Sequence, residues 1–281
     1  MRDRLALYTQ PYEGIKSYFE MIEIAKEHGL SKLEILNHLE LTLPDVEFAK
    51  KLKKYAMENG ITFPCVSVGI QLMVDDPTKE IEQLKKYAEI AAILGSPFLH
   101  HTIAFSWENP DEVYSHKEEY FEKGIKAVRE VYDYAQSLGV RVITEDQGFI
   151  FNGKENFKRY IDQVDRNVGV VADFGNIQFV DEELETFIPL FADRIVHAHV
   201  KDYKFIKEGE YQDLEGGYLT LRHNKICDTD LGKGTVNIKQ IINELNKIGY
   251  KGVIALEAMI GNRDDEDILE KNILFMEEVL K

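Results

Sequence analysis

The sequence is poor in cysteine and has no long hydrophobic run. Only Cys65 and Cys227 are present among 281 residues, and neither belongs to a CxxC pair. So few thiols are typical of a reducing cytoplasm and do not predict a disulfide framework. The longest apolar runs, such as 90–94, fall far short of the roughly 20 residues that a membrane-spanning helix needs. The first ten residues show no secretory signal pattern, so we expect a cytoplasmic protein.

Positive charge is also scarce. The chain has 34 Lys and Arg residues against 50 Asp and Glu residues, which gives a formal net charge of −16. A surface this acidic repels the phosphates of nucleic acids and of anionic lipids, so we expect neither a nucleic-acid nor a membrane partner. Hydrophobic residues make up 44% of the chain, which is enough for a sizeable core and excludes general disorder.

Short apolar runs alternate eight times with longer amphipathic stretches. The apolar runs are 5–8, 33–36, 61–68, 97–101, 140–145, 168–173, 195–201 and 252–257. The helical stretches are 15–28, 44–59, 78–94, 117–138, 156–164, 184–191, 238–248 and 267–280. Strict alternation of strand and helix predicts parallel strands joined by right-handed crossovers. Eight such units predict one (β/α)8 TIM barrel spanning residues 1–281 as a single domain.

A doubly wound open sheet is the alternative fold. Against it, no GxGxxG motif follows the first apolar run, and no GxxxxGK[ST] motif is present in the chain. One long polar stretch, Asp202–Asn237, separates the seventh strand from its helix. A loop of that length in a compact domain is usually a lid or a substrate loop.

Four consecutive strands end in a residue that can bind a metal ion. These residues are Glu145, Asp173, His199 and Glu257. In a TIM barrel the functional groups lie at the carboxyl ends of the strands, so these four side chains are expected to meet at one mouth.

Alternation along the last two strands supports this placement. From position 196 the seventh strand places apolar residues on one face and His197, His199 and Lys201 on the other. The apolar face should pack on the helices, which turns the polar face into the barrel. Glu257 then faces inward from the eighth strand, and Glu34 of the second strand is expected to have a structural part. Three carboxylates buried together without a cation would cost several kcal/mol each, so we expect a metal ion among them.

The second half of the chain resembles a known family. The motifs ITED, DFGN, HAHVKD and LGKGTVN…IGYKGVIALE occur in that order. The ordered set is similar to the xylose-isomerase-like barrels, and specifically to the sugar phosphate isomerase/epimerase group. The resemblance implies Glu145, Asp173, His199 and Glu257 as ligands of a divalent metal. Three oxygen ligands and one nitrogen ligand favour Mn²⁺, with Mg²⁺, Co²⁺ or Zn²⁺ as alternatives.

The resemblance also implies a reaction. We expect isomerisation or epimerisation of a small ketose or ketose phosphate by proton transfer beside a carbonyl, with the metal stabilising an enediolate. Glu145 and Glu257 would be the catalytic carboxylates, one removing a proton and the other returning it. Family members commonly carry a histidine three residues after the ligand aspartate. Here that residue is Asn176, which can bind a substrate hydroxyl but cannot transfer a proton near neutral pH.

Several further residues are candidates for substrate binding. Lys201 would bind a substrate oxygen or phosphate, or else pair with Asp173 or Asp202. Because His100 and His101 are adjacent on a strand, only one can face the barrel, and we expect it to be His101.

Two loop residues complete the candidate set. Trp107, in the loop after the fourth strand, would wall a sugar site or pack its own loop. Arg222, in the long loop after the seventh strand, is expected to reach the substrate.

Three other functions remain open. A metal-dependent dehydratase or lyase of a cyclitol or keto acid begins with the same proton removal. A family-2 apurinic endonuclease needs additional histidines. The segment after Asp202 offers only His223, and Asn176 stands where another histidine is expected. A barrel that only binds a sugar would lack a ligand or a base, and none is missing. The resemblance permits a homo-oligomer.

Overall fold

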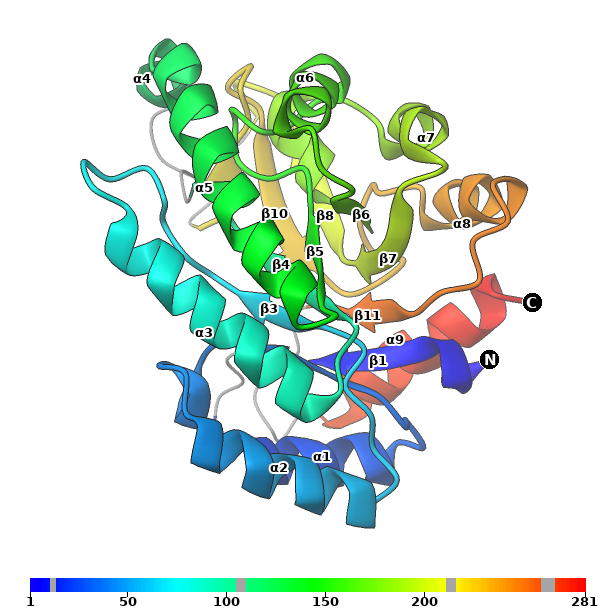
Figure 1. Ribbon diagram of the computed structural model, residues 1–281. Coiled ribbons are helices and arrows are strands. Elements are labelled where there is room, and N and C mark those ends of the chain that lie inside the picture. The colour runs from blue at the N-terminus through cyan, green and yellow to red at the C-terminus, as the bar shows by residue number, and fades with distance from the viewer. Residues whose placement is uncertain (11–13, 105–109, 211–215, 259–265) are drawn as a thin grey trace.

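The apolar runs form a closed barrel of eight parallel strands (Figure 1). The computed structural model describes residues 1–10, 14–104, 110–210, 216–258 and 266–281. The barrel strands are β1 (Leu5–Tyr8), β2 (Leu33–Leu36), β3 (Val66–Val68), β4 (Phe98–His101), β5 (Arg141–Thr144), β6 (Gly169–Asp173), β7 (Ile195–Val200) and β11 (Ile254–Leu256). The pairing of β1 with β11 closes the ring. The predicted TIM barrel is therefore confirmed, and the open-sheet alternative is wrong.

Helices cover the outside of the barrel (Figure 1). They are α1 (Tyr18–Glu27), α2 (Val46–Glu58), α3 (Thr78–Leu94), α4 (Pro110–Ser115), α5 (Lys117–Ser137), α6 (Lys154–Val164), α7 (Leu184–Phe187), α8 (Ile238–Lys247) and α9 (Glu266–Val279). Polar side chains mark several starts: Ser17 accepts a hydrogen bond from the backbone N–H of Glu20, and Asp45 accepts one from that of Phe48. Such caps satisfy N–H groups that have no partner within the helix.

Proline changes two elements that the hydrophobic pattern predicts. The apolar run 61–68 contains Pro64, which has no N–H to donate to a neighbouring strand, and only the last part of the run forms β3. The predicted helix 184–191 contains Pro189. This predicted helix is divided in the structure into α7 and the 3₁₀ helix η4 (Ile188–Phe191).

The segment after β7 contains a small sheet instead of the predicted irregular loop. Its antiparallel strands are β8 (Asp202–Ile206), β9 (Tyr218–Leu219) and β10 (Lys225–Thr229), in the order β8–β10–β9. We call this three-stranded sheet the mouth sheet, because its residues line the cavity at the mouth of the barrel that is described below.

Two aspartates anchor the mouth sheet to the barrel. The carboxylate of Asp202 accepts hydrogen bonds from three backbone N–H groups of the segment that follows the sheet, at 2.9–3.1 Å. Asp181 follows the 3₁₀ helix η3 (Asn176–Val180) and accepts three further hydrogen bonds, at 2.7–2.9 Å. The donors are the side chains of Thr220 and Asn224 and the backbone N–H of Arg222. Both ends of the sheet are therefore fixed by charge-assisted hydrogen bonds.

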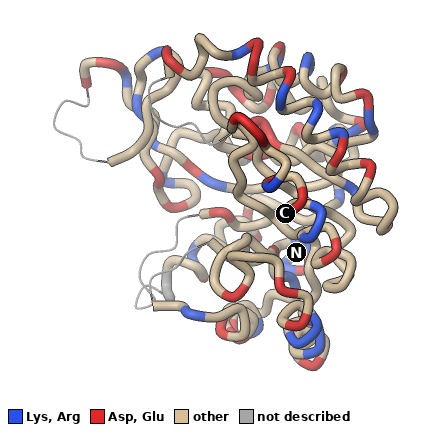
Figure 2. Tube along the Cα trace, turned by 60° about the vertical axis from the view of Figure 1, so that its left-hand side comes forward, with Lys and Arg blue, Asp and Glu red and all other residues tan. Residues whose placement is uncertain are grey.

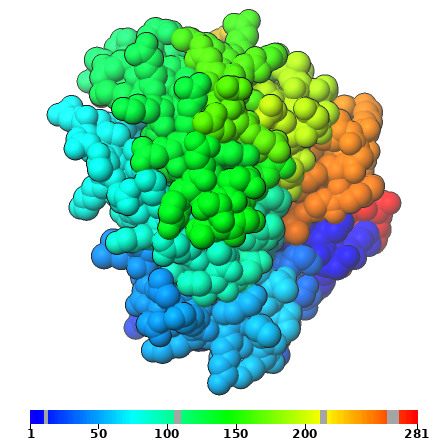
Figure 3. Space-filling view, viewed as in Figure 1, coloured from blue at the N-terminus to red at the C-terminus, as the bar shows by residue number. Residues whose placement is uncertain are grey.

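The main core lies between the strands and the helices. Ala198 and Val200 of β7 and Ile254 and Leu256 of β11 are buried in it, as the alternation predicts. In the space-filling view the colours follow the chain order, from blue and cyan below through green to orange on the right, so that consecutive units lie side by side (Figure 3). The inward faces of the strands carry the polar groups at the mouth, together with two small apolar clusters. One cluster contains Ala6, Tyr8 and Ala255, and the other contains Cys65, Ile143 and Val171.

Charged residues of both signs are interspersed along the outer helices (Figure 2). Many form ion pairs within a helix, such as Lys123 with Glu119 and Lys158 with Asp162. Within the described ranges, no helix is both long enough and apolar enough to cross a membrane.

Candidate metal centre and active site

Four strand-end residues converge inside the mouth of the barrel. Glu145 follows β5, Asp173 ends β6, His199 lies on β7 and Glu257 follows β11. One oxygen or nitrogen atom from each side chain lies within 4.8 Å of the corresponding atoms of the other three. The structure thus brings together all four residues that the strand-end pattern singles out. We call this group the carboxylate–histidine cluster.

The converging atoms are buried, and none has a hydrogen-bond partner among the residues that the structure describes. They are Glu145 Oε2, Asp173 Oδ2, His199 Nδ1 and Glu257 Oε2. His199 Nδ1 lies 3.2 Å from Glu145 Oε2 and 3.1 Å from Glu257 Oε2, without the geometry of a hydrogen bond. Buried polar atoms are normally satisfied. Four unsatisfied atoms that point at one another, three oxygens and one nitrogen, fit a divalent cation as their common partner.

The pKa values in the cluster support the same conclusion. Burial raises the pKa of the Asp173 carboxyl to about 7. Burial alone would lower the pKa of the His199 imidazole, but the surrounding carboxylates outweigh it and raise that pKa well above its usual range. Both shifts arise because negative charge is concentrated in a desolvated space. Protons on these groups supply the positive charge that a cation would otherwise provide.

Glu34 of β2 supports the cluster from inside the barrel. Its side chain is completely buried and accepts hydrogen bonds from His197 Nε2 at 2.6 Å, from His199 Nε2 at 3.0 Å and from Ser67 Oγ at 2.7 Å. Glu34 therefore has a structural role, as expected, and that role is to orient the ring of His199. Its carboxylate holds the Nε2 side of His199, so that Nδ1 faces the other three residues of the cluster.

Lys201 lies at the edge of the cluster. Its ammonium group is 3.1 Å from Asp173 Oδ2 and 2.9 Å from Glu257 Oε1, and it donates to Asn176 Oδ1 at 3.3 Å. Of the partners considered from the sequence, Asp173 is therefore present. Asp202 is instead engaged with backbone N–H groups. Because Lys201 fixes the oxygen of the Asn176 amide, the buried Nδ2 is left without a partner and available to a ligand.

The two histidines of β4 face different surroundings. His100 Nδ1 lies 3.1 Å from Ser67 Oγ, and its ring meets that of His199 edge to face. His101 instead places Nδ1 2.9 Å from the backbone oxygen of Thr102. The ring that faces the cluster is thus that of His100, and the expectation that it would be His101 is not met. The pleat turns alternate residues inward, and pairing of β4 with β3 and β5 places His100 in the inward set.

A cavity of about 200 Å³ opens from the cluster toward the mouth sheet. It is lined by Gln10, Gln147, Asn176, Phe179, Lys201, Tyr203, Tyr218, Asp228 and Glu257. The sequence pattern identified Asn176, Lys201 and Glu257 but not the residues of the mouth sheet. The overlooked signal is the alternation of polar and apolar residues in DYKF (202–205), which is typical of short strands.

Two predicted substrate residues are not placed at this cavity. The side chain of Arg222 is exposed, and its backbone N–H donates to Asp181 at 2.9 Å in the turn between β9 and β10. Arg222 is not among the residues that line the cavity. Trp107 lies outside the described residues.

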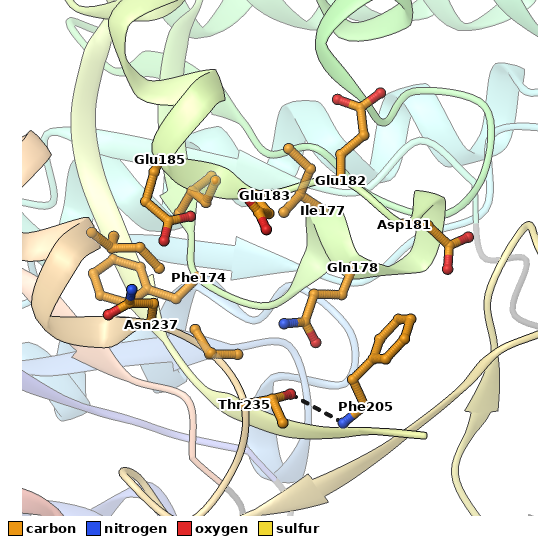
Figure 4. A pocket seen from close by; sticks show the side chains of 13 residues that line it. Phe174, Ile177, Gln178, Asp181, Glu182, Glu183, Glu185, Phe205, Thr235 and Asn237 are labelled. Carbon is orange, nitrogen blue, oxygen red and sulfur yellow. Dashed lines mark hydrogen bonds between the residues drawn. The ribbon is translucent and has the colours of Figure 1, made fainter. Parts of the chain in front are cut away.

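A second, larger cavity of about 520 Å³ lies beside the barrel, and no residue of the cluster lines it. Figure 4 shows Gln178 between Phe205 and Glu183, with Phe174 near Asn237 on the opposite side. The backbone N–H of Phe205 donates to Thr235 Oγ1 at 3.1 Å and closes its lower edge. Because its walls share no residue with the cluster, this cavity is separate from the metal centre.

The fold and the cluster together define a class of protein: a (β/α)8 barrel with three carboxylates and a histidine gathered at its carboxyl-terminal mouth. The chain belongs to the family of xylose isomerase-like TIM barrels, whose sequence profile matches residues 22–279.

Solved structures with the same fold include sugar epimerases and a dehydratase. D-psicose 3-epimerase from Clostridium cellulolyticum H10, solved with D-tagatose, is 19% identical, with a TM-score of 0.73 and coverage of 99% of both chains. The apo 3-keto-D-glucoside 4-epimerase of E. coli is 17% identical, with a TM-score of 0.75 and coverage of 98% of this chain and 99% of that chain. A probable 3-DHS dehydratase of petrobactin synthesis from Bacillus anthracis is 14% identical, with a TM-score of 0.74 and coverage of 98% of both. At these identities the likeness is one of fold. A search of curated proteins finds no significant match.

Proposed function

We propose that this protein is a divalent-metal-dependent isomerase or epimerase of a small ketose or ketose phosphate. One observation carries the proposal. Four buried ligand atoms without hydrogen-bond partners converge beside a cavity lined by amide, ammonium, hydroxyl and carboxyl groups. Fold-level similarity to sugar epimerases supports the same function as an analogy.

The cation would be held by Glu145, Asp173, His199 and Glu257. Mn²⁺ is our first choice because the set contains three oxygens and one nitrogen, and Mg²⁺, Co²⁺ and Zn²⁺ are the alternatives. A cation bound there would polarise a substrate carbonyl and stabilise the negative charge that develops when the adjacent C–H loses its proton.

The proton transfers are assigned to two carboxylates on different strands. In our scheme Glu257 takes the proton from the carbon beside the carbonyl on one side of the substrate, and Glu145 returns a proton on the other side. Lys201 holds Oε1 of Glu257 at 2.9 Å, which leaves Oε2 directed into the cluster. Burial opposes ionisation of Glu257, but Lys201 and His199 outweigh it and lower the pKa of Glu257 to about 2. A carboxylate that is ionised and fixed in place is ready to accept a proton.

Asn176 orients the substrate in this scheme. Its Nδ2 has no partner in the described part of the chain and donates to a substrate hydroxyl, while its oxygen stays on Lys201. An amide does not titrate near neutral pH, so it contributes binding and no proton transfer. All proton movement then falls to the two glutamates.

A dehydratase or lyase is the second candidate. It begins with the same removal of a proton beside a carbonyl and then expels a hydroxide from the next carbon. The Lys201 ammonium, within hydrogen-bond distance of Glu257, is placed to protonate that leaving group. An endonuclease is disfavoured by the net charge of −16.

Solvent-exchange NMR tests the proposal. The Mn²⁺-loaded protein is incubated in D₂O with free ketoses, ketose phosphates and hydroxypyruvate, and proton spectra are recorded. We expect deuterium to enter beside the carbonyl of one of these substrates. Glu257→Gln should slow this exchange by about 10²–10⁴-fold, because a positioned carboxylate contributes that much to proton transfer.

Controls separate chemistry from metal loss. Metal content is measured in every sample, and Glu183→Gln, an exposed change of the same kind, should exchange like the wild type. Formation of a dehydrated product in place of the exchanged substrate would favour the lyase. Absence of both reactions with metal bound would refute the isomerase.

A further inference from the structure

One face of the mouth sheet turns toward the barrel. Within the antiparallel register, Tyr203 of β8 lies opposite Asp228 of β10, while Ile226 of β10 lies opposite both Phe205 and Tyr218. These residues alternate along their strands and therefore share a face. Tyr203 and Ile226 on this face are buried in one apolar group with two phenylalanines from the loops after β5 and β6.

Asp228 is the one charged residue on that otherwise apolar and aromatic face. It lines the 200 Å³ cavity together with Lys201 and Glu257. Within the described part of the chain, its carboxylate makes no hydrogen bond to another side chain. Asp228 is exposed at the cavity, so its carboxylate is open to a ligand group that carries hydrogen-bond donors.

Among the described residues that line the cavity, none offers a free cation near Asp228. Among its lining residues only Lys201 carries positive charge, and this ammonium is already shared between Asp173 and Glu257. An anionic group at the mouth-sheet end of the cavity would therefore meet the Asp228 carboxylate with no compensating cation from the described lining residues. Hydroxyl groups, in contrast, would find acceptors and donors on every side.

We propose that Asp228 determines the specificity of the site. It accepts hydrogen bonds from the hydroxyl groups at the end of the sugar far from the cluster, and it rejects substrates that carry a phosphate or carboxylate there. The inference rests on the proposed function and narrows it to small uncharged polyhydroxy ketones. The cavity volume agrees with this class, because it lies below the roughly 300–1,000 Å³ typical of pockets for drug-sized ligands.

The test compares a free ketose with the same ketose phosphorylated at its terminal carbon, for example D-fructose and D-fructose 6-phosphate. Exchange in D₂O gives kcat/KM for each compound with the wild type, Asp228→Asn and the matched control Asp230→Asn, which removes a nearby charge that does not line the cavity. We expect the wild type to favour the free ketose. Asp228→Asn should reduce that preference about tenfold, because juxtaposed like charges cost more than 1.4 kcal/mol. Asp230→Asn should leave it unchanged.

Binding is measured in parallel, so that the result does not depend on turnover. Saturation-transfer NMR of the two compounds should show the free ketose bound to the wild type, and the phosphate bound only to Asp228→Asn. A wild type that prefers the phosphate, or an equal preference in Asp228→Asn and the wild type, would overturn the inference. If binding discriminates as expected but no substrate exchanges deuterium, the proposed function fails and the specificity of the site stands.

Discussion

Glu34 Oε1 lies 3.0 Å from Nε2 of His199, across the imidazole ring from the nitrogen that faces the carboxylate–histidine cluster. The second oxygen of Glu34 lies 2.6 Å from Nε2 of His197. A carboxylate can only accept hydrogen bonds, so both rings must present N–H at Nε2. The lone pair of neutral His199 is thereby directed to Nδ1, where a metal ion would bind.

Glu34→Gln should weaken metal binding by about 10–100-fold, the usual effect of losing the partner of a ligand histidine. The amide would set an NH₂ group against one of the two rings and release its orientation. Titration calorimetry with Mn²⁺ measures the change, with Glu183→Gln as the control. An unchanged affinity would mean that Glu34 serves packing alone.

Lys201→Met should make the stability of the fold depend strongly on metal. Removing one member of a buried ion pair costs about 3–5 kcal/mol, since the remaining carboxylates lose their countercharge. Urea denaturation in EDTA should show a loss of this size, and added Mn²⁺ should recover much of it. Lys204→Met, an exposed change on β8, should show neither effect. An equal loss with and without Mn²⁺ would argue that Lys201 does not share its partners with a cation.

His101 should make the protein sensitive to acid. Burial lowers its pKa to about 4, against 6.5 for an unperturbed histidine. Between these values the unfolded chain binds a proton that the folded chain does not, so the free energy of unfolding falls as the pH decreases from about 6.5 to 4. Integrated over that window, the loss is about 3 kcal/mol.

Urea midpoints between pH 7 and pH 4 check this expectation. The wild type should lose more stability across the window than His101→Gln, which cannot be protonated. His116→Gln, a substitution at an exposed site, should follow the wild type. Parallel profiles for all three proteins would contradict the assignment.

Gly175→Ala should disturb the cavity without straining the backbone. Gly175 has φ −112° and ψ −30°, which any residue adopts, but an added Cβ would lie 2.6 Å from Lys201 Cγ and 2.5 Å from the Tyr203 ring. Forcing an extra carbon into a packed site typically costs about 1–3 kcal/mol. We expect a lower urea midpoint and slower exchange, and an unchanged exchange rate would show that Lys201 and Tyr203 tolerate displacement.

Much of the fold and the cluster could be predicted because each signal is local. Period-two alternation assigned His199 and Lys201 to the inner face of β7, and the count of strand–helix units indicated the barrel. Strand-end positions then brought Glu145 and Asp173 together, since parallel strands end at the same mouth.

The remainder depended on contacts that the sequence does not display. The choice between His100 and His101 is set by the register of β4 against its neighbours, which one residue of shift would reverse. The strands of the mouth sheet are short and rich in charged residues, so their sequences resemble those of a loop. Asp228 becomes notable only when its pairing with Tyr203 shows which way it faces.

The anchoring of the mouth sheet has a consequence for how such a protein can diversify. The converging atoms of the cluster come from residues at the ends of β5, β6, β7 and β11. The far wall of the cavity comes instead from one continuous segment, the mouth sheet, which is held by hydrogen bonds to Asp181 and Asp202. Residues inserted or exchanged within the mouth sheet leave the eight barrel strands unchanged. We therefore expect this segment to be exchangeable: grafting it between barrels of this fold should transfer ligand preference while the four residues of the cluster keep their positions.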